Sequence, residues 1–290
     1  GRVGRSDMQS YCFLSTDNLD GYVFDDDLAI EPLRKLGWEV STIPWRAEID
    51  WNDFAAVIIR TTWDYQDSPD DFLRALQKIN ESKARLENSL QTVEWNLSKE
   101  YLRDLENKGV KIVPTMWSEK TPTENDFASW LTHFQIDEII IKPIISATAQ
   151  DTFRLKTFEP NLAEVFKSRK YMVQPFMPNI VSEGEFSLFY FGGNYSHTIL
   201  KTPKNEDFRV QEEHGGIITA VSPSKNLLRT AEHIFSFIEP TPLYARIDFV
   251  RDEHDDFCLM ELELIEPALY LRMDENAPKF FAETVDKWLK

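Results

Sequence analysis

The sequence lacks any long apolar run and has few cysteines, and each shortage excludes a class of protein. No stretch approaches the roughly 20 apolar residues that span a bilayer. The first seven residues are polar and no apolar stretch follows them, so we expect no secretory signal and interpret them as a cloning remnant. Cys12 and Cys258 stand in apolar, strand-like runs. Two such cysteines make no disulfide framework, and we expect buried thiols in a reducing cytoplasm.

Several common site signatures and partner signals are also missing. There is no GxGxxG or P-loop motif, no Ser/His/Asp or Cys/His set, and no zinc-ligand spacing among the five histidines. The formal net charge of −17 repels nucleic acid and anionic membranes, so we expect neither as a partner. A small anion can still bind where a few cations converge. The absence of a long heptad pattern excludes a coiled-coil dimer and leaves other homodimers open.

The first part of the chain alternates between strand and helix patterns. Three segments are predicted as strands: residues 11–14, 38–43 and 55–60. The third is apolar throughout, which is typical of a strand buried on both faces. Helices are expected between the first two strands, up to Gly37, and after the third, where Ser68 is the N-cap and Pro69 the first helical residue. This alternation predicts a small parallel sheet covered by helices.

From residue 88 onward the pattern changes. We expect a helix from about Asn96 to Gly109 and a long helix after Pro223. The expected strands are residues 111–115, 138–143 and 172–176, a hairpin around Gly192–Asn194, and a last hairpin with a polar turn at residues 251–256.

The last hairpin carries an unusual set of charges. Alternate residues of a strand share a face, so Glu261 and Glu263 point the same way, as do Arg246 and Asp248. A turn centred on residues 254–255 pairs Asp248 with Glu261 and Arg246 with Glu263. Like charges directly opposite each other destabilise a sheet, so three carboxylates on one face call for a cation. Oxygen-only ligands suit magnesium. The alternative is a solvated edge hairpin in which Arg246 forms a salt bridge.

Cationic side chains stand at strand and helix ends elsewhere. Lys142 ends an apolar strand, and the small, hydroxyl-rich loop that follows it can lay backbone N–H groups around phosphates. Lys99, Lys201 and Arg209 stand at a helix start, a strand end and a turn before a double glycine. Each residue alone is also explained as an ordinary surface cation.

Taken together, these segments resemble the ATP-grasp superfamily over roughly residues 88–270. The motifs occur in order: Lys99, IIIKP with Lys142, VQPFMP, GEFSL with Glu185, ILK with Lys201, FRVQEEHGG, ARID and ELELIEP. The spacing of Asp248, Glu261 and Glu263 is similar to the metal-ligand pattern of D-alanine–D-alanine ligases and glutathione synthetases, many of which carry asparagine at the last position. FRVQEEHGG resembles the arginine segment of the glutamate ligases that modify ribosomal protein tails. RTTWDY and ELELIEP resemble the branch that includes the D-cycloserine-forming cyclo-ligase.

The resemblance implies an α/β protein of three lobes. Residues 9–87 would form an N-terminal parallel α/β substrate domain, and residues 88–290 the ATP-grasp domain. Within the latter, a small central lid lobe would cover about 113–173 and a C-terminal catalytic lobe with an antiparallel sheet about 174–290. ATP would bind between these last two lobes.

The resemblance also implies roles for individual residues. Lys99 and Lys142 would contact the ATP phosphates, and Lys201 and Arg209 would face the phosphates and an acyl phosphate. Gln174, Phe176 and Met177 would line the adenine pocket, and Glu185 would hold the ribose hydroxyls. Asp248, Glu261 and Glu263 would bind Mg²⁺, with Mn²⁺ as an alternative ion. Arg246 would stabilise the oxyanion that forms during amine attack.

The RTTWDY segment follows the third predicted strand. In open α/β sheets, ligands bind outside the carboxyl ends of the strands. We therefore expect the acceptor side of the site to involve these residues: Arg60, Thr62, Trp63, Asp64 and Tyr65. The alternative is a packed loop with Trp63 in the core.

The resulting hypothesis is an ATP- and magnesium-dependent ligase that forms an amide bond through an acyl phosphate. Its substrates would be a carboxylate and an amine from amino acids, peptides or related small molecules. Both groups could also belong to one molecule, which would then cyclise. Two alternatives remain. The first is an ATP-grasp-type kinase, which stops at phosphoryl transfer, and the second is a non-catalytic nucleotide-binding regulatory protein, in which loss of a metal carboxylate or phosphate lysine is expected.

Overall fold

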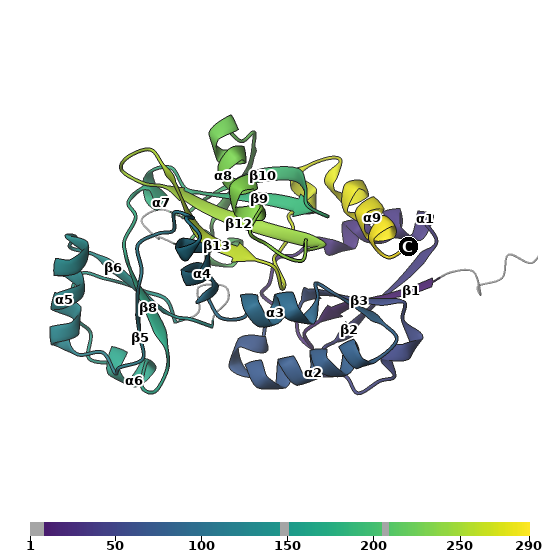
Figure 1. Ribbon diagram of the computed structural model, residues 1–290, viewed down its shortest axis with the longest axis horizontal. Coiled ribbons are helices and arrows are strands. Elements are labelled where there is room, and N and C mark those ends of the chain that lie inside the picture. Colours follow the sequence, from purple (N-terminus) through teal and green to yellow (C-terminus); the bar gives the residue numbers. More distant parts are fainter. Residues whose placement is uncertain (1–8, 146–150, 205–208) are drawn as a thin grey trace, which may run out of the picture.

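The computed structural model describes residues 9–145, 151–204 and 209–290, which form three β-sheets with helices packed against them (Figure 1). The first seven residues and residues 146–150 of the small-residue loop lie outside the described part, as does Phe208 of the FRVQEEHGG motif. The mixed α/β class that the sequence predicts is confirmed. Among the described helices, none is long and apolar enough to cross a membrane.

The N-terminal sheet is parallel, with the strand order β2-β1-β3-β4. Its strands are β1 (Gln9–Ser15), β2 (Trp38–Pro44), β3 (Ala56–Thr61) and β4 (Arg85–Glu87). Helix α1 (Ile30–Lys35) follows the short 3-10 helix Asp26–Ala29 and precedes Gly37, as expected. Helix α2 (Pro69–Glu81) begins after Ser68, although the Ser68 side chain makes no capping hydrogen bond.

Both faces of β3 are buried, which explains its unbroken apolar sequence. Val57 and Ile59 pack on α2 and on α3 (Leu90–Asn96) in one apolar cluster. Ala56 and Ile58 belong to a second cluster that contains α1, the C-terminal helix α9 (Ala277–Trp288) and residues of the large antiparallel sheet. The N-terminal lobe is therefore held to the rest of the chain by a continuous core.

The large sheet is antiparallel and has the order β11-β10-β9-β12-β13. Its strands are β9 (Glu185–Phe191), β10 (Asn194–Thr202), β11 (Ile217–Val221), β12 (Tyr244–Arg251) and β13 (Phe257–Glu263). One face packs on α8 (Lys225–Phe235) and α4 (Tyr101–Asn107) through residues such as Leu188, Ile247 and Leu262. Alternation leaves the polar residues of the same strands on the opposite face.

A β-bulge adjusts the last hairpin. Asp248 pairs with Glu261, but Phe249 pairs with Leu259, so Met260 is an extra residue in β13. Strict alternation would place Leu259 on the same face as Glu261. The bulge instead turns Leu259 into the apolar core, where it is fully buried with Phe249. One sheet face can thus be acidic while the other stays apolar.

The smallest sheet is also antiparallel, in the order β5-β8-β6-β7. Its strands are β5 (Met116–Ser118), β6 (Ile139–Pro143), β7 (Phe153–Leu155) and β8 (Tyr171–Pro175). Helix α5 (Glu124–Phe134), which begins with a Thr123–Asp126 capping box, and helix α6 (Leu162–Val165) cover one face. The short helix α7 (Asn179–Ser182) leads from this sheet to β9.

Two predicted elements differ from the structure. The helix expected from about Asn96 to Gly109 is present as α4, but its start differs: α3 ends at Asn96 and α4 begins at Tyr101. The Asn96 side chain bonds the backbone of Leu262 and Leu264 on the far side of the core, which fixes the chain direction at the break.

The predicted strand at residues 111–115 is also absent. Ile112 forms only an isolated bridge with Leu259, and β5 begins at Met116. Pro114 lacks the backbone N–H that would continue the ladder. The segment instead crosses from the large sheet to the small one.

Candidate active site

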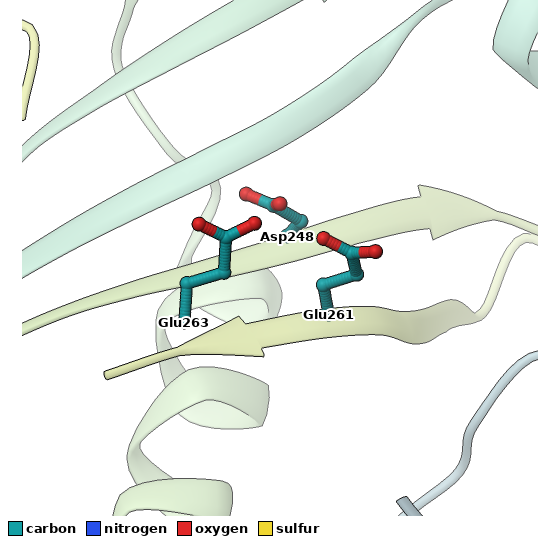
Figure 2. Close-up of side chains that lie close together, drawn as sticks. All are labelled: Asp248, Glu261 and Glu263. Atoms are coloured by element: carbon teal, nitrogen blue, oxygen red, sulfur yellow. The ribbon is translucent and has the colours of Figure 1, made fainter. Parts of the chain in front are cut away.

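Three carboxylates converge on the polar face of the large sheet. Asp248 rises from β12 and Glu261 and Glu263 from β13, all toward the same side (Figure 2). One oxygen from each lies within 4.8 Å of the others. The predicted register is confirmed, with Asp248 opposite Glu261 and Arg246 opposite Glu263. The alternative of a solvated edge hairpin does not hold, since Asp248 is only 1% exposed.

Two cations hold these acids from different directions. Arg246 Nη2 lies 3.0 Å from Asp248 Oδ2 and 2.7 Å from Glu263 Oε1. Lys99 Nζ lies 2.7 Å from Glu261 Oε1. Burial alone would lower the pKa of Lys99, but the carboxylates of Glu261 and Glu263 raise it, so the lysine stays charged. These two cations therefore already neutralise part of the negative charge of the three acids.

The pKa values of the two acids of β13 are shifted in opposite directions. Burial favours the neutral form of Glu261, but Lys99 and Lys142 outweigh this effect and lower its pKa. Burial, together with the nearby charges of Glu261 and Asp248, raises the pKa of Glu263 to about 8 despite the attraction of Arg246. A divalent cation would remove the repulsion that keeps Glu263 protonated.

A second buried ion pair lies beside the first set. Lys201 on β10 is 3% exposed, and its Nζ lies 3.8 Å from both Glu185 Oε1 and Asp248 Oδ1. Glu185 begins β9 and pairs with Lys201 across the ladder. Burial raises the pKa of Glu185 to about 7 in spite of Lys201. Ser187 donates a hydrogen bond to Asp248 Oδ1 and fixes that carboxylate.

The small sheet supplies the opposite wall of a pocket. Ile140 and Gln174 are register partners on β6 and β8, and both line the pocket together with Lys142 and Met177. The three carboxylates, together with Arg246, Lys201 and Arg209, belong to the same lining. Burial lowers the pKa of Lys142, whose charge would be restored beside a phosphate. The pocket thus joins an apolar wall to a charged floor.

The residues present fit a magnesium ion. The three grouped side chains offer only carboxylate oxygens, the ligands that magnesium prefers together with substrate phosphates. No histidine or cysteine belongs to this group, so a zinc-type donor set is not formed by it.

Comparisons with known proteins agree with this architecture. A family described as the N-terminal domain of the D-cycloserine synthetase DcsG matches residues 11–88. The cycloserine biosynthesis protein DcsG of Streptomyces lavendulae is 26% identical over 288 residues, which cover 92% of this chain and 94% of that protein. The crystal structure of D-cycloserine synthetase DcsG superposes with a TM-score of 0.82 at 22% identity, covering 97% of this chain and all (100%) of that one.

Two more distant structures share the same plan. The ATP-grasp ligase PsnB, complexed with a minimal precursor, has a TM-score of 0.66 at 15% identity and covers 98% of this chain and 100% of its own. The macrocyclase MdnB from Microcystis aeruginosa MRC has a TM-score of 0.66 at 14% identity, with 97% and 99% covered. PsnB has also been crystallised with Mg and ADP.

The chain has the ATP-grasp fold. As in the arrangement expected from the sequence, an N-terminal parallel α/β sheet precedes two antiparallel sheets that enclose a pocket.

Most of the residues expected in the ATP-grasp site are brought together, and two lie apart from the pocket lining. Phe176 packs under the guanidinium of Arg154, 3.9 Å from the ring centroid, and is 5% exposed. Lys99 reaches the site through Glu261 and is not itself part of the lining. Gln174 does line the pocket, although its amide nitrogen donates to Thr115 Oγ1.

The RTTWDY residues divide between core and site. Arg60 does not line the pocket: it is 1% exposed, pairs with Asp26 at 2.8 Å and donates to the Pro267 carbonyl. Thr62 is fully buried, and Asp64 accepts hydrogen bonds from Trp45 and Arg46. Arg60 and Thr62 are buried, Asp64 is partly exposed, and none of the three lines the pocket.

Trp63 and Tyr65 are the members of this segment that reach the site. Trp63 lines the pocket, and its Nε1 donates to the Glu266 carbonyl at 2.7 Å. The Tyr65 hydroxyl is hydrogen-bonded to the Glu266 carboxyl. Sequence reasoning missed Glu266, although it stands within the ELELIEP motif that already supplies two of the acids. The signal was its place shortly after β13, within the same motif.

Proposed function

We propose that this protein is an ATP- and magnesium-dependent carboxylate–amine ligase that works through an acyl phosphate. The observation that carries the proposal is the group of Asp248, Glu261 and Glu263 on the wall of the pocket that the two antiparallel sheets enclose. A carboxylate is a poor electrophile, and transfer of the γ-phosphoryl group from ATP to one of its oxygens gives it a good leaving group. The amine nitrogen then forms the C–N bond, phosphate leaves, and the amine proton passes to solvent.

The cations of the pocket suit phosphoryl transfer. Lys142 and Lys201 enter from opposite walls, and Arg209 lines the same pocket. Catalysis of phosphoryl transfer consists mainly of positioning and charge neutralisation. Asp248, Glu261 and Glu263 would hold the magnesium ion, which supplies charge neutralisation for the transferred group. The apolar residues Ile140 and Met177 fit the adenine ring, and Glu185 fits the ribose hydroxyls.

Arg246 is suited to the second half of the reaction. Its Nε and Nη2 are held by Asp248 at 3.0 Å each, and Nη2 is also held by Glu263. A guanidinium fixed on two sides keeps its direction while charge builds on a nearby oxygen. We place it beside the oxyanion formed when the amine attacks.

The relatives favour one class of substrate. The relative named for cycloserine biosynthesis covers nearly the whole chain, and the structure of D-cycloserine synthetase superposes more closely than those of the peptide-acting neighbours. We therefore propose a small amine-bearing carboxylate, including one whose own nitrogen closes a ring. Peptide substrates are the second class to test.

The decisive experiment follows ADP release with ATP and magnesium over a panel of amino acids and short peptides, alone and in pairs. Hydroxylamine, which traps acyl phosphates as hydroxamates, serves as a common amine. A carboxylate labelled with ¹⁸O should deliver one labelled oxygen to the released phosphate. The Asp248→Asn variant is expected to lose ADP release, and Asp256→Asn, in the turn between β12 and β13, is the matched control.

Three outcomes would contradict the proposal. A stable phosphorylated product that forms without any amine would indicate a kinase. Magnesium-dependent binding of a non-hydrolysable ATP analogue with no turnover of any acid would favour a regulatory module. Failure of the analogue to bind would remove the nucleotide site altogether.

A further inference from the structure

Glu266 is a buried acid of the pocket that neither the metal site nor the phosphate contacts use. It lies beyond the end of β13, is 6% exposed and lines the same pocket as the metal-site acids. It does not belong to the group whose oxygens lie within 4.8 Å of one another. Buried acids are rare unless they are paired, so this side chain needs a partner.

The contacts of Glu266 fix it in place and leave one oxygen unsatisfied. The Tyr65 hydroxyl bonds to its carboxyl, and Trp63 Nε1 holds its backbone carbonyl at 2.7 Å. Oε2 is buried and has no hydrogen-bond partner among the described residues. Buried polar atoms without partners are uncommon in native proteins and are often functional. A hydrogen-bond donor beside Oε2 would supply the missing contact.

The nearby cations are already engaged with other acids. Lys99 contacts Glu261 at 2.7 Å, and Arg246 contacts Asp248 and Glu263. Two aromatic residues line the same pocket: Trp63, which contacts the Glu266 backbone, and Tyr270. A carboxylate with neighbouring aromatic rings is a suitable environment for an organic cation. An ammonium group offers donors that satisfy the open oxygen and a charge that suits both kinds of neighbour.

We propose that Glu266 binds the amino group of the acid substrate and thereby makes the site specific for amine-bearing carboxylic acids. The proposal rests on the ligase function argued above. Tyr65 and Trp63, from the N-terminal lobe, are positioning residues: they hold Glu266 and do not act on the reacting atoms. The RTTWDY segment thus takes part in substrate recognition through Glu266.

The test compares acids that differ only in the amino group: serine with 3-hydroxypropanoate, alanine with propanoate and glutamate with glutarate, each amino acid as both its L and its D enantiomer. Each is assayed for ADP and hydroxamate formation with ATP, magnesium and hydroxylamine. We expect at least one amine-bearing acid to exceed its partner by roughly tenfold or more in kcat/KM, the effect of one hydrogen bond to a charged group. Glu266→Gln should abolish this difference, chiefly through KM.

Matched variants separate recognition from folding. Glu87→Gln alters an acid that is equally buried, at 6% exposed, but lies outside this pocket. It should keep the preference for amines. Tyr65→Phe removes one hydroxyl and should raise KM for the amine-bearing acid more than it lowers kcat. All three variants should bind the magnesium complex of a non-hydrolysable ATP analogue as the unmodified protein does.

The outcomes distinguish this proposal from the function on which it rests. Equal turnover of both members of every pair, or a preference that survives in Glu266→Gln, would overturn the role of Glu266 alone. Analogue binding without turnover of any acid in the panel would also count against an amine-bearing acid substrate. Loss of analogue binding in the unmodified protein would instead overturn the ligase proposal, and this inference with it.

Discussion

Lys99 and Glu261 are separated by 162 positions, yet Lys99 Nζ lies 2.7 Å from Glu261 Oε1. Lys99 stands in the break between α3 and α4, and its backbone N–H donates to the carbonyl of Ile144 just after β6. One residue therefore contacts an acid of the large sheet through its side chain and the small sheet's connection through its backbone. Its position links the acid cluster of the large sheet to the segment that follows β6.

Replacing Lys99 with glutamine should weaken nucleotide binding. Without the ammonium group, the pKa of Glu261 rises, because Lys99 is the first of the groups that lower it. We expect the dissociation constant of magnesium–ATP to rise by roughly tenfold, as for loss of a charged hydrogen bond. Isothermal titration measures it. Lys111→Gln is the control, since Lys111 pairs with Asp252 and Asp256 in the distant turn; equal losses in both variants would contradict a specific role.

The two acids of β13 should respond differently to substitution. Glu261→Gln removes a charged ligand and leaves Lys99 without its carboxylate partner. We therefore expect the rate of ADP release to fall by about a hundredfold or more, in the range of a lost transition-state contact. Glu263→Asn keeps an oxygen ligand and removes a repelled charge, so activity should stay within about tenfold. Magnesium titration of ADP release compares the two. Equal loss in both would indicate that charge count, and not ligand geometry, controls the site.

The acid cluster could be predicted because strand alternation and charge pattern determine it locally. Glu261 and Glu263 must share a face, and the hairpin brings Asp248 opposite. The prediction assumed a symmetrical turn, whereas the ladder nearer the turn is displaced by one residue and the bulge at Met260 restores the pairing. The sequence carries no clear signal for that bulge.

Contacts between distant segments could not be predicted in the same way. The amide of Asn96 bonds to the backbone of the strand end at Leu262 and Leu264, which breaks the helix expected there. Arg60 likewise lies near the end of the apolar strand β3 and resembles a site residue until its buried partner Asp26 is known. Such pairings depend on how lobes pack, and local periodicity does not encode them.

Glu263 should give the metal-free protein a measurable pH dependence. Its pKa is raised from 4.5 to about 8 by burial and by Glu261 and Asp248, so the folded state keeps a proton that the unfolded state has released. Its contribution to stability is therefore complete below pH 4.5 and is lost as the pH rises through 8. Chemical unfolding in EDTA between about pH 5 and 9 should show this loss, and Glu263→Gln should reduce it.

Magnesium provides the complementary measurement. Because a cation binds the ionised Glu263 carboxylate more tightly than its protonated form, magnesium affinity should increase with pH up to about 8. In Glu263→Gln this increase should be much smaller. An affinity that is independent of pH in the unmodified protein would show that Glu263 is already ionised without the ion.

Gly184 should tolerate no side chain, because it controls the start of the strand that carries Glu185. Its φ is +114°, and an added Cβ would lie 2.5 Å from the Lys201 carbonyl oxygen. We expect Gly184→Ala to cost about 1–3 kcal/mol from backbone strain alone, with further loss from the contact. Gly109→Ala is the matched control, because Gly109 also has a positive φ, +96°, but nothing lies within 4 Å of its added Cβ. Both variants should lower Tm, but only Gly184→Ala should also weaken binding of an ATP analogue, since Lys201 and Glu185 must shift. Equal affinities in the two variants would show that this strand end does not shape the nucleotide site.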